Sequence, residues 1–364
     1  MSGAFVATSV LFLVYLSQCF GSVPAISAVF LVNDRLKGRL LRRSWGTGPA
    51  GRRIFLLNPF LPHVGAVYTD HIPFVVRRRE DGESVYLEAL AAASHSPNTI
   101  SFEQEHEIEA SGKDVFVDDC KFLSVRSEAI AQTTAELLNR LQKTAGESKL
   151  AVLEKNFQAR FALKALDERL EKYATNSAYL QSACFALFFF VFLLGPAAVF
   201  FLGLHRTWFA LLLYLILSCA GITWLFVRAH RQIFPQKKGW PLQHMTTIAF
   251  SPFAAIRAND LLVAELLAEL HPVAVARRLL EAREFRRFAE GELRKARFLH
   301  NDEFLAGVLE QFLRQNGVEP ESLLGSPQRE NEAARTYCPV CLTQYVVAKG
   351  NCQDCEGAEL VRLR

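Results

Sequence analysis

The sequence predicts a multi-domain α+β integral membrane protein. Long uncharged apolar runs alternate with polar stretches, and the 364-residue chain is 51% hydrophobic but only 21% charged. One polar stretch is rich in short β-prone runs, whereas the other has the spacing of amphipathic helices. This composition excludes a disordered tail protein, a collagen-like repeat and a disulfide-dense miniprotein. The net charge of +4 is too small to indicate nucleic-acid binding by itself.

Three segments are long and apolar enough to cross a bilayer, which requires about 20 residues. We expect transmembrane helices over residues 4–32, 183–204 and 208–227, none of which contains Asp, Glu, Lys or Arg. Only residues 205–207 separate the last two, which predicts a tight helical hairpin, and Gly195-Pro196 predicts a kink in its first helix. A cleaved signal peptide is the alternative for the first segment. That segment lacks the basic start of a signal peptide, which favours a retained anchor.

Basic residues beside these segments predict their orientation. Lys and Arg gather after the first segment, before the second and after the third, whereas the hairpin loop has Arg206 alone. Basic loops remain on the cytoplasmic side. We therefore expect a multi-pass protein with the lipid bilayer as a partner and with both soluble parts, residues 33–182 and 228–364, in the cytoplasm.

The first soluble part divides into a basic linker over residues 33–51, a β-rich domain over 52–126 and amphipathic helices over 127–182, with a break expected at Gly146. Residues 99–110 alternate in polarity, which predicts one strand. The polar face of this strand would carry Glu103, Glu105, Glu107 and Glu109. The candidate partners of these glutamates are Arg77, Arg78 and Arg79. In its order of elements this part broadly resembles a pleckstrin-homology-like module, which implies binding of lipid headgroups or protein segments.

No readable catalytic or cofactor-binding motif occurs in this part. Residues 46–51 read GxGxxG, but a dinucleotide site needs a strand before this pattern and a helix after it, so we interpret it as linker. Four histidines lack the spacing of metal ligands: His63, His71, His95 and His106. Asp118-Asp119 predicts a turn.

In the second soluble part, the sequence predicts an α-helical region over residues 240–317 and a linker over 318–336. Ser251 and Asp302 are expected helix N-caps, and Asn316-Gly317 is a typical helix stop. Residues 277–297 hold eight Lys or Arg against four Glu. This segment has two interpretations, contact with anionic headgroups or an ordinary solvated helix face.

Four of the eight cysteines form the strongest motif in the chain. Cys338, Cys341, Cys352 and Cys355 follow the pattern CxxC, ten residues, CxxC. Two such knuckles supply four thiolates at tetrahedral geometry, which Zn²⁺ favours. Residues 337–364 resemble a zinc ribbon, although the spacer is short and neither knuckle has Gly directly after its last Cys. Two disulfides or an iron site are the alternatives, and a cytosolic tail disfavours disulfides.

These patterns predict a membrane-anchored, non-enzymatic scaffold that displays cytoplasmic modules, one of them stapled by structural zinc. We expect a protein partner for the ribbon or for the helical region. One alternative is a membrane-bound enzyme with an unrecognised site in residues 50–126. The other is a membrane-tethered nucleic-acid-binding regulator, which the ribbon's lack of excess positive charge disfavours.

Overall fold

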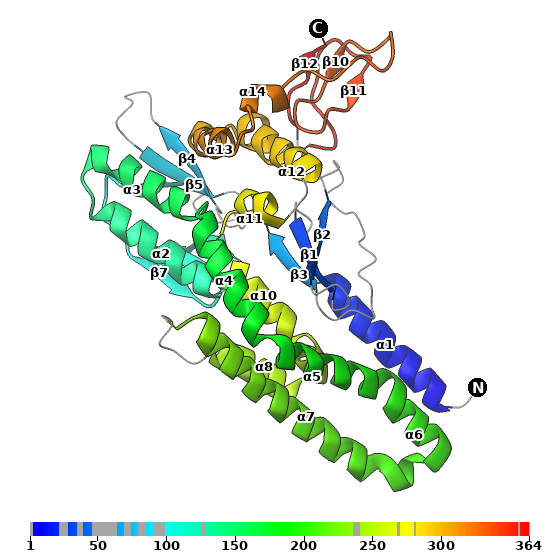
Figure 1. Ribbon diagram of the computed structural model, residues 1–364. Coiled ribbons are helices and arrows are strands. Elements are labelled where there is room, and N and C mark those ends of the chain that lie inside the picture. The colour runs from blue at the N-terminus through cyan, green and yellow to red at the C-terminus, as the bar shows by residue number, and fades with distance from the viewer. Residues whose placement is uncertain are drawn as a thin grey trace.

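The computed structural model describes residues 3–363 except for 22–27, 35–38, 46–63, 69–73, 79–84, 90–98, 126–127, 236–240, 268–269, 280–281 and 356. This part of the chain is mixed α+β, as predicted, and it is mostly helical (Figure 1). An apolar helical hairpin forms one end of the molecule, and the small sheets lie away from the hairpin turn.

Two helical stretches of the hairpin are long and apolar enough to cross a membrane, Ala178–Leu202 and Leu204–Ile233. The first comprises α5 (Ala178–Phe189), a π-helical turn (Phe190–Leu194) and α6 (Gly195–Leu202), and the second is α7 (Leu204–Ile233). The chain reverses at Gly203, whose φ of +80° suits glycine alone. The prediction of a loop at residues 205–207 was therefore wrong, because α7 starts directly after Gly203.

The π-helical turn lies directly before Gly195-Pro196, where the sequence predicts a kink. Pro196 has no N–H, and its ring crowds the carbonyl one turn earlier. Regular α-helical bonding is therefore interrupted at this point.

The first apolar segment is not one continuous helix. α1 (Gly3–Gly21) is followed by β1 (Ala28–Asp34), which pairs antiparallel with β2 (Arg39–Trp45) and with β3 (Val64–Tyr68). The predicted helix over residues 4–32 was wrong beyond Gly21, and the predicted linker over 33–51 was wrong where β2 lies. Gly21 and Pro24 disfavour a longer helix, and the Val- and Phe-containing run after them favours a strand.

Six further strands form two antiparallel sheets. The first sheet contains β4 (Phe74–Arg78), β5 (Val85–Ala89) and β6 (Thr99–Ser101), and the second contains β7 (Ile108–Ser111), β8 (Asp114–Val117) and β9 (Cys120–Ser124). A turn separates β6 from β7, so the single strand predicted over residues 99–110 was wrong, and Glu103, Glu105 and Glu107 lie outside any strand. Arg77 instead pairs with Glu88 on the neighbouring strand, at 3.0 Å.

Helices account for most of the remaining chain. Between β9 and the hairpin lie α2 (Glu128–Gln142), α3 (Gly146–Ala159) and α4 (Leu163–Asn176), with the predicted break directly before Gly146. After the hairpin come α8 (Leu242–Phe250), α9 (Pro252–Ile256), α10 (Ala258–Leu267), α11 (Pro272–Leu279), α12 (Ala282–Arg294), α13 (Glu303–Gln315) and α14 (Pro320–Leu323).

Local signals in this helical region are confirmed. The Ser251 and Asp302 side chains each accept a hydrogen bond from a backbone N–H three residues later. α13 ends before Asn316, and Gly317 takes a φ of +73°. The predicted linker over residues 318–336 contains a short helix, α14.

The two soluble parts share one hydrophobic core. Helices α10 and α11 lie beside the β1–β2–β3 sheet, and α13 lies beside β4 (Figure 1). Phe157 of α3 packs edge-on against Phe304 of α13, with ring centroids 5.2 Å apart. The Phe161 ring stacks on His271 at 4.5 Å, and the His271 N–H donates to the Arg160 carbonyl. Segments on either side of the hairpin therefore fold as one body.

Candidate metal centre

The C-terminal tail forms a small antiparallel sheet that carries the four cysteines. Its strands are β10 (Thr336–Tyr337), β11 (Gln344–Tyr345) and β12 (Val361–Arg362), in the order β11-β10-β12. Strands of two residues bury little apolar surface, so this sheet has almost no core of its own. A crosslink at its centre would therefore add much of its stability.

Backbone hydrogen bonds close each CxxC segment into a tight turn. In the first, the Cys338 N–H donates to the Thr343 carbonyl at 2.9 Å, and the Leu342 N–H donates back to the Cys338 carbonyl at 2.8 Å. In the second, the Cys352 N–H donates to the Ala358 carbonyl at 2.8 Å. Each turn ends in a left-handed residue, Leu342 at φ +65° and Gly357 at φ +87°. Gly357 takes this conformation without strain, whereas Leu342 takes it at a cost of about 1–2 kcal/mol.

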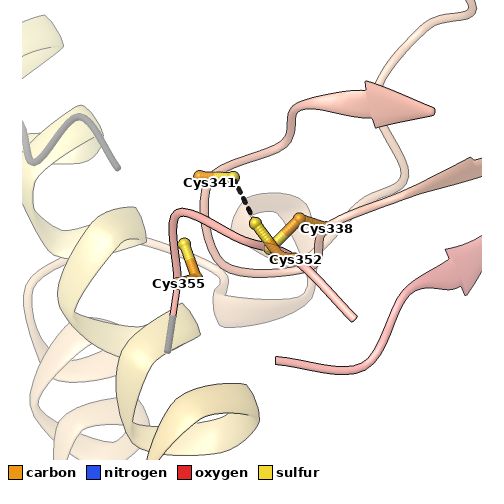
Figure 2. Close-up of side chains that lie close together, drawn as sticks. All are labelled: Cys338, Cys341, Cys352 and Cys355. Carbon is orange, nitrogen blue, oxygen red and sulfur yellow. Dashed lines mark hydrogen bonds between the residues drawn. The ribbon is translucent and has the colours of Figure 1, made fainter. Parts of the chain in front are cut away.

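These turns bring together the four cysteines that the sequence predicts as ligands. All four sulfur atoms lie within 4.8 Å of one another (Figure 2). The Cys341 and Cys352 sulfurs are 3.7 Å apart, close to the ~3.8 Å edge of a tetrahedron with Zn–S distances of about 2.3 Å. Cys338, Cys352 and Cys355 are buried and Cys341 is half-buried. Four sulfurs in this arrangement can hold a metal ion.

Burial and hydrogen bonding shift the pKa values of the thiols in different directions. Burial raises the pKa of Cys338 to about 11, and burial together with the Cys341 thiol raises the pKa of Cys355 further. Burial also opposes ionisation of Cys352, but hydrogen bonds with the Tyr345 hydroxyl at 3.2 Å, the Asp354 N–H and the Cys338 and Cys341 thiols together outweigh it and lower the pKa of Cys352 to about 7. Four thiolates this close repel one another, and a bound cation removes that repulsion.

The tail is docked on α12 through a buried arginine. The Arg294 side chain is only 2% exposed. Its guanidinium donates to the backbone carbonyls of Pro339 at 3.1 Å, Leu323 at 2.7 Å and Gly325 at 2.8 Å. Pro339 lies inside the first CxxC turn, so Arg294 connects the metal centre directly to the helical body.

Most of the basic segment over residues 277–297 bonds within the fold. Arg278 pairs with Asp167, Arg297 pairs with Glu310, and Lys295 pairs with Glu292 at 3.1 Å. Arg277 donates to the Asn316 side chain at 3.3 Å. Together with Arg294, five of the eight basic side chains therefore have partners inside the protein, which favours the interpretation as an ordinary helix face.

The β-rich part contains no second metal cluster among its described residues. His106 is held by its neighbours: Nδ1 lies 2.6 Å from Asp118 Oδ2, and Nε2 lies 2.9 Å from the Ser101 carbonyl. Asp118 and Asp119 take φ values of +50° and +61° in the turn between β8 and β9, as predicted. The other three histidines of this part lie outside the described residues: His63, His71 and His95.

Arg294 is the functional residue that sequence reasoning missed. The core face of α12 carries Phe285, Phe288 and Leu293, and Arg294 lies on the opposite side of the helix. The ribbon buries Arg294 by folding back on α12. Because that contact joins residues 45 positions apart, no local periodicity signals it.

No family model, curated protein or solved structure matches this chain.

Proposed function

We propose that this protein is a membrane-anchored, non-enzymatic scaffold whose cytoplasmic body displays a zinc-stapled ribbon to a protein partner. The four-sulfur centre carries this proposal. Four cysteines fill every position of a tetrahedral Zn²⁺, so the ion has no open position for a substrate and acts as a structural crosslink.

The exposure of the hairpin supports a membrane anchor. Only 17% and 22% of the most apolar windows of its two stretches are buried within the protein, whereas a core helix of a soluble protein is mostly buried. The large exposed side chains include Phe201 at 79% and Phe209 at 62%. A surface of this kind requires an apolar environment.

Helix α1 supports a third membrane segment. It lies beside α6 in Figure 1, and Tyr15 packs against Phe188 and Phe192 of the hairpin with centroids 5.9 and 5.2 Å away. Its other side exposes Val10 at 53% and Leu13 at 63%. We propose that α1, Ala178–Leu202 and Leu204–Ile233 cross the bilayer together, with the basic flanks holding the soluble body in the cytoplasm.

The ribbon has apolar side chains available to a partner. Val346 is 61% exposed, Val347 47% and Val361 40%, although the tail has few apolar residues to spare for its own interior. Exposed valines beside a rigid metal-crosslinked turn suit a protein contact better than a charged ligand.

Photocrosslinking in intact cells tests this role. Benzoylphenylalanine replaces Val346 in the full-length chain, with the same group at the exposed Glu332 as the matched control. We expect a protein adduct of defined mass from position 346 that position 332 does not give, and we expect Cys352→Ser to abolish it. Benzoylphenylalanine is also placed at Val361, the third exposed valine. If neither position 346 nor position 361 gives a protein adduct, the scaffold proposal fails.

A further inference from the structure

We infer that α8 and α9 form a re-entrant helical pair that enters the bilayer from the cytoplasmic side and contacts lipid acyl chains. This inference rests on the proposed membrane hairpin. It differs from the sequence-based expectation that residues 240–317 lie entirely in the cytoplasm.

The composition of this segment fits a lipid environment. Residues 241–256 contain no Asp, Glu, Lys or Arg, and the first charge after them is Arg257. Phe250 at the end of α8 is 87% exposed and Leu242 at its start is 65% exposed. An 87% exposed phenylalanine in an uncharged segment is unfavourable in water and favourable among acyl chains.

Side-chain contacts fix the depth of the pair relative to the hairpin turn at Gly203. Near the start of α8, His244 stacks on Phe226, with centroids 5.8 Å apart and ring planes at 13°. Phe226 lies 23 residues after Gly203, a distance of roughly 34 Å along a helix. The start of α8 is therefore at the edge of a hydrocarbon core of about 30 Å.

The first residues of α9 lie much deeper. The Phe253 ring stacks on Phe192 at 6.3 Å and lies 5.8 Å from Tyr15 of α1. Phe192 lies 11 residues before Gly203, roughly 16 Å from the turn. Phe253 is therefore near the middle of the hydrocarbon core.

The chain then returns to the side from which it entered. The Cys184 thiol donates to the Ala255 carbonyl at 3.3 Å, and the Tyr173 hydroxyl donates to Asn259 Oδ1 at 3.0 Å. Tyr173 belongs to α4, which precedes the hairpin. Residues 242–259 thus go into the hairpin region and come out at the same end.

Several backbone donors at the apex of the pair are paired within the segment itself, which lowers the cost of placing the apex in hydrocarbon. The Ser251 N–H donates to the Thr247 carbonyl at 3.1 Å, and the Ser251 hydroxyl accepts from the Ala254 N–H at 3.3 Å. Pro252 has no N–H to satisfy. The Ala255 N–H donates to the Ser251 carbonyl at 2.9 Å. Ser251-Pro252 therefore turns the chain with the N–H groups of Ser251, Ala254 and Ala255 all paired.

Photocrosslinking to lipid tests the inference on full-length protein in phosphatidylcholine vesicles. Benzoylphenylalanine, a phenylalanine whose ring carries a photoreactive benzoyl group, replaces Phe250. The same group at Phe209 of α7 tests the hairpin itself, and at Val346 of the ribbon it reports an exposed apolar position outside the membrane. We expect phospholipid adducts by mass spectrometry from positions 250 and 209 and none from position 346.

The outcomes separate this inference from the proposed anchor. Lipid adducts from position 209 without any from position 250 overturn the re-entrant pair and leave the membrane hairpin intact. A protein adduct at position 250 in place of lipid also overturns it, because another chain then covers Phe250. Absence of lipid adducts at both positions overturns the hairpin as well.

Discussion

Cys352 shows how one side chain determines the state of the whole tail. Its sulfur lies close to Cys341 and the Tyr345 hydroxyl, and the sheet around it is too small to fold without a crosslink. Binding of zinc by four thiolates contributes about 10 kcal/mol or more to folding of such a site. We predict that Cys352→Ser lowers bound zinc from about one ion per chain to near zero and exposes residues 336–363 to protease, while the proposed membrane helices stay inserted.

Elemental analysis and limited proteolysis of the purified full-length chain check this prediction. Cys120→Ser is the matched control, because Cys120 is an exposed free cysteine that is not part of the cluster, and it should change neither readout. A wild-type protein without zinc, or with its four tail cysteines oxidised in intact cells, would contradict both the metal and the cytoplasmic placement.

Asp118 gives the turn between β8 and β9 a pH-dependent stability. Hydrogen bonds from the His106 ring and from the Glu107 N–H hold the pKa of Asp118 below its ordinary value. A carboxylate with a lowered pKa stabilises the fold above its ordinary pKa, and this contribution is lost as the pH falls through the folded-state pKa. We therefore predict that Asp118→Asn lowers the melting temperature at pH 7, and that the difference from wild type shrinks as the pH falls below about 4, the ordinary pKa of aspartate.

The substitution keeps the backbone, since asparagine also tolerates the left-handed conformation that Asp118 adopts. Asp119→Asn provides the control, because it removes a neighbouring charge at the same kind of backbone site while both His106 nitrogens keep their partners, Asp118 and Ser101. Melting curves in detergent at pH 7 and pH 3 give the comparison. An Asp118→Asn effect that is equal at both pH values would show that its charge plays no part.

Some of these residue-scale features could be predicted from the sequence and others could not. The Ser251 and Asp302 caps are local, because each depends on a side chain and a backbone N–H three residues apart. The Asp118-Asp119 turn was predictable because aspartate tolerates the left-handed conformation. The convergence of the four cysteines follows from spacing alone. The burial of Arg294 depends on a distant part of the chain, and leucine rarely takes the left-handed conformation of Leu342, so neither could be predicted.

At the scale of single elements, two glycines in the hairpin have opposite roles. Gly203 takes φ +80° and ψ 146°, a conformation that other residues adopt at a cost of about 1–3 kcal/mol. Gly221 lies in the interior of α7, where alanine is about 1 kcal/mol more favourable and a Cβ would meet nothing within 4 Å. We predict that Gly203→Ala lowers the melting temperature and Gly221→Ala raises it.

Thermal melting of the detergent-solubilised protein measures both variants under one condition, so each glycine controls for the other. A Cβ at Gly203 also meets nothing within 4 Å, and any loss there reports backbone strain instead of a clash. Stabilisation by Gly203→Ala would mean that the hairpin turns elsewhere.

The contact between α12 and the ribbon depends on the shape of the Arg294 side chain. Its planar guanidinium serves three carbonyls at once, which an ammonium on a flexible stem cannot match. We predict that Arg294→Lys weakens docking by about 2 kcal/mol or more, because buried carbonyls lose their donors. Hydrogen exchange should rise in residues 320–345 while zinc stays bound, and Arg286→Lys at an exposed position of α12 should leave both unchanged.

The boundaries of helices and strands were predictable only where the nearby residues alone determine them. The hairpin follows from two uncharged runs, and its exact turn at Gly203 depends on a backbone conformation that composition does not specify. Uncharged residues 28–32 read as membrane helix, yet they pair with β2 and β3. Long-range pairing of this kind overrides a hydropathy signal, just as the turn after β6 interrupts the polarity alternation over residues 99–110.

At the scale of the whole molecule, one core joins segments that the sequence presents as separate modules. The β1–β2–β3 sheet precedes the hairpin, whereas α10 and α11 beside it follow the hairpin. Residues before and after the two apolar stretches can pack together only when both lie on one side of the hairpin. The shared core therefore requires these segments to lie on one side of the hairpin, and the basic flanks favour the cytoplasm as that side.

This placement predicts the result of reporter fusions in cells. A reporter inserted at Ser148, an exposed position in α3, and a second fused after Arg364 should both report the cytoplasm, because α3 and α13 meet in the contact between Phe157 and Phe304. A third reporter in the hairpin turn beside Gly203 should report the opposite side. Ser148 and Arg364 on opposite sides would mean that the shared core does not form in the membrane, and three crossings would then no longer fit the chain. A reporter at Gly203 on the same side as the other two would leave the core intact but would make the hairpin re-entrant instead of spanning.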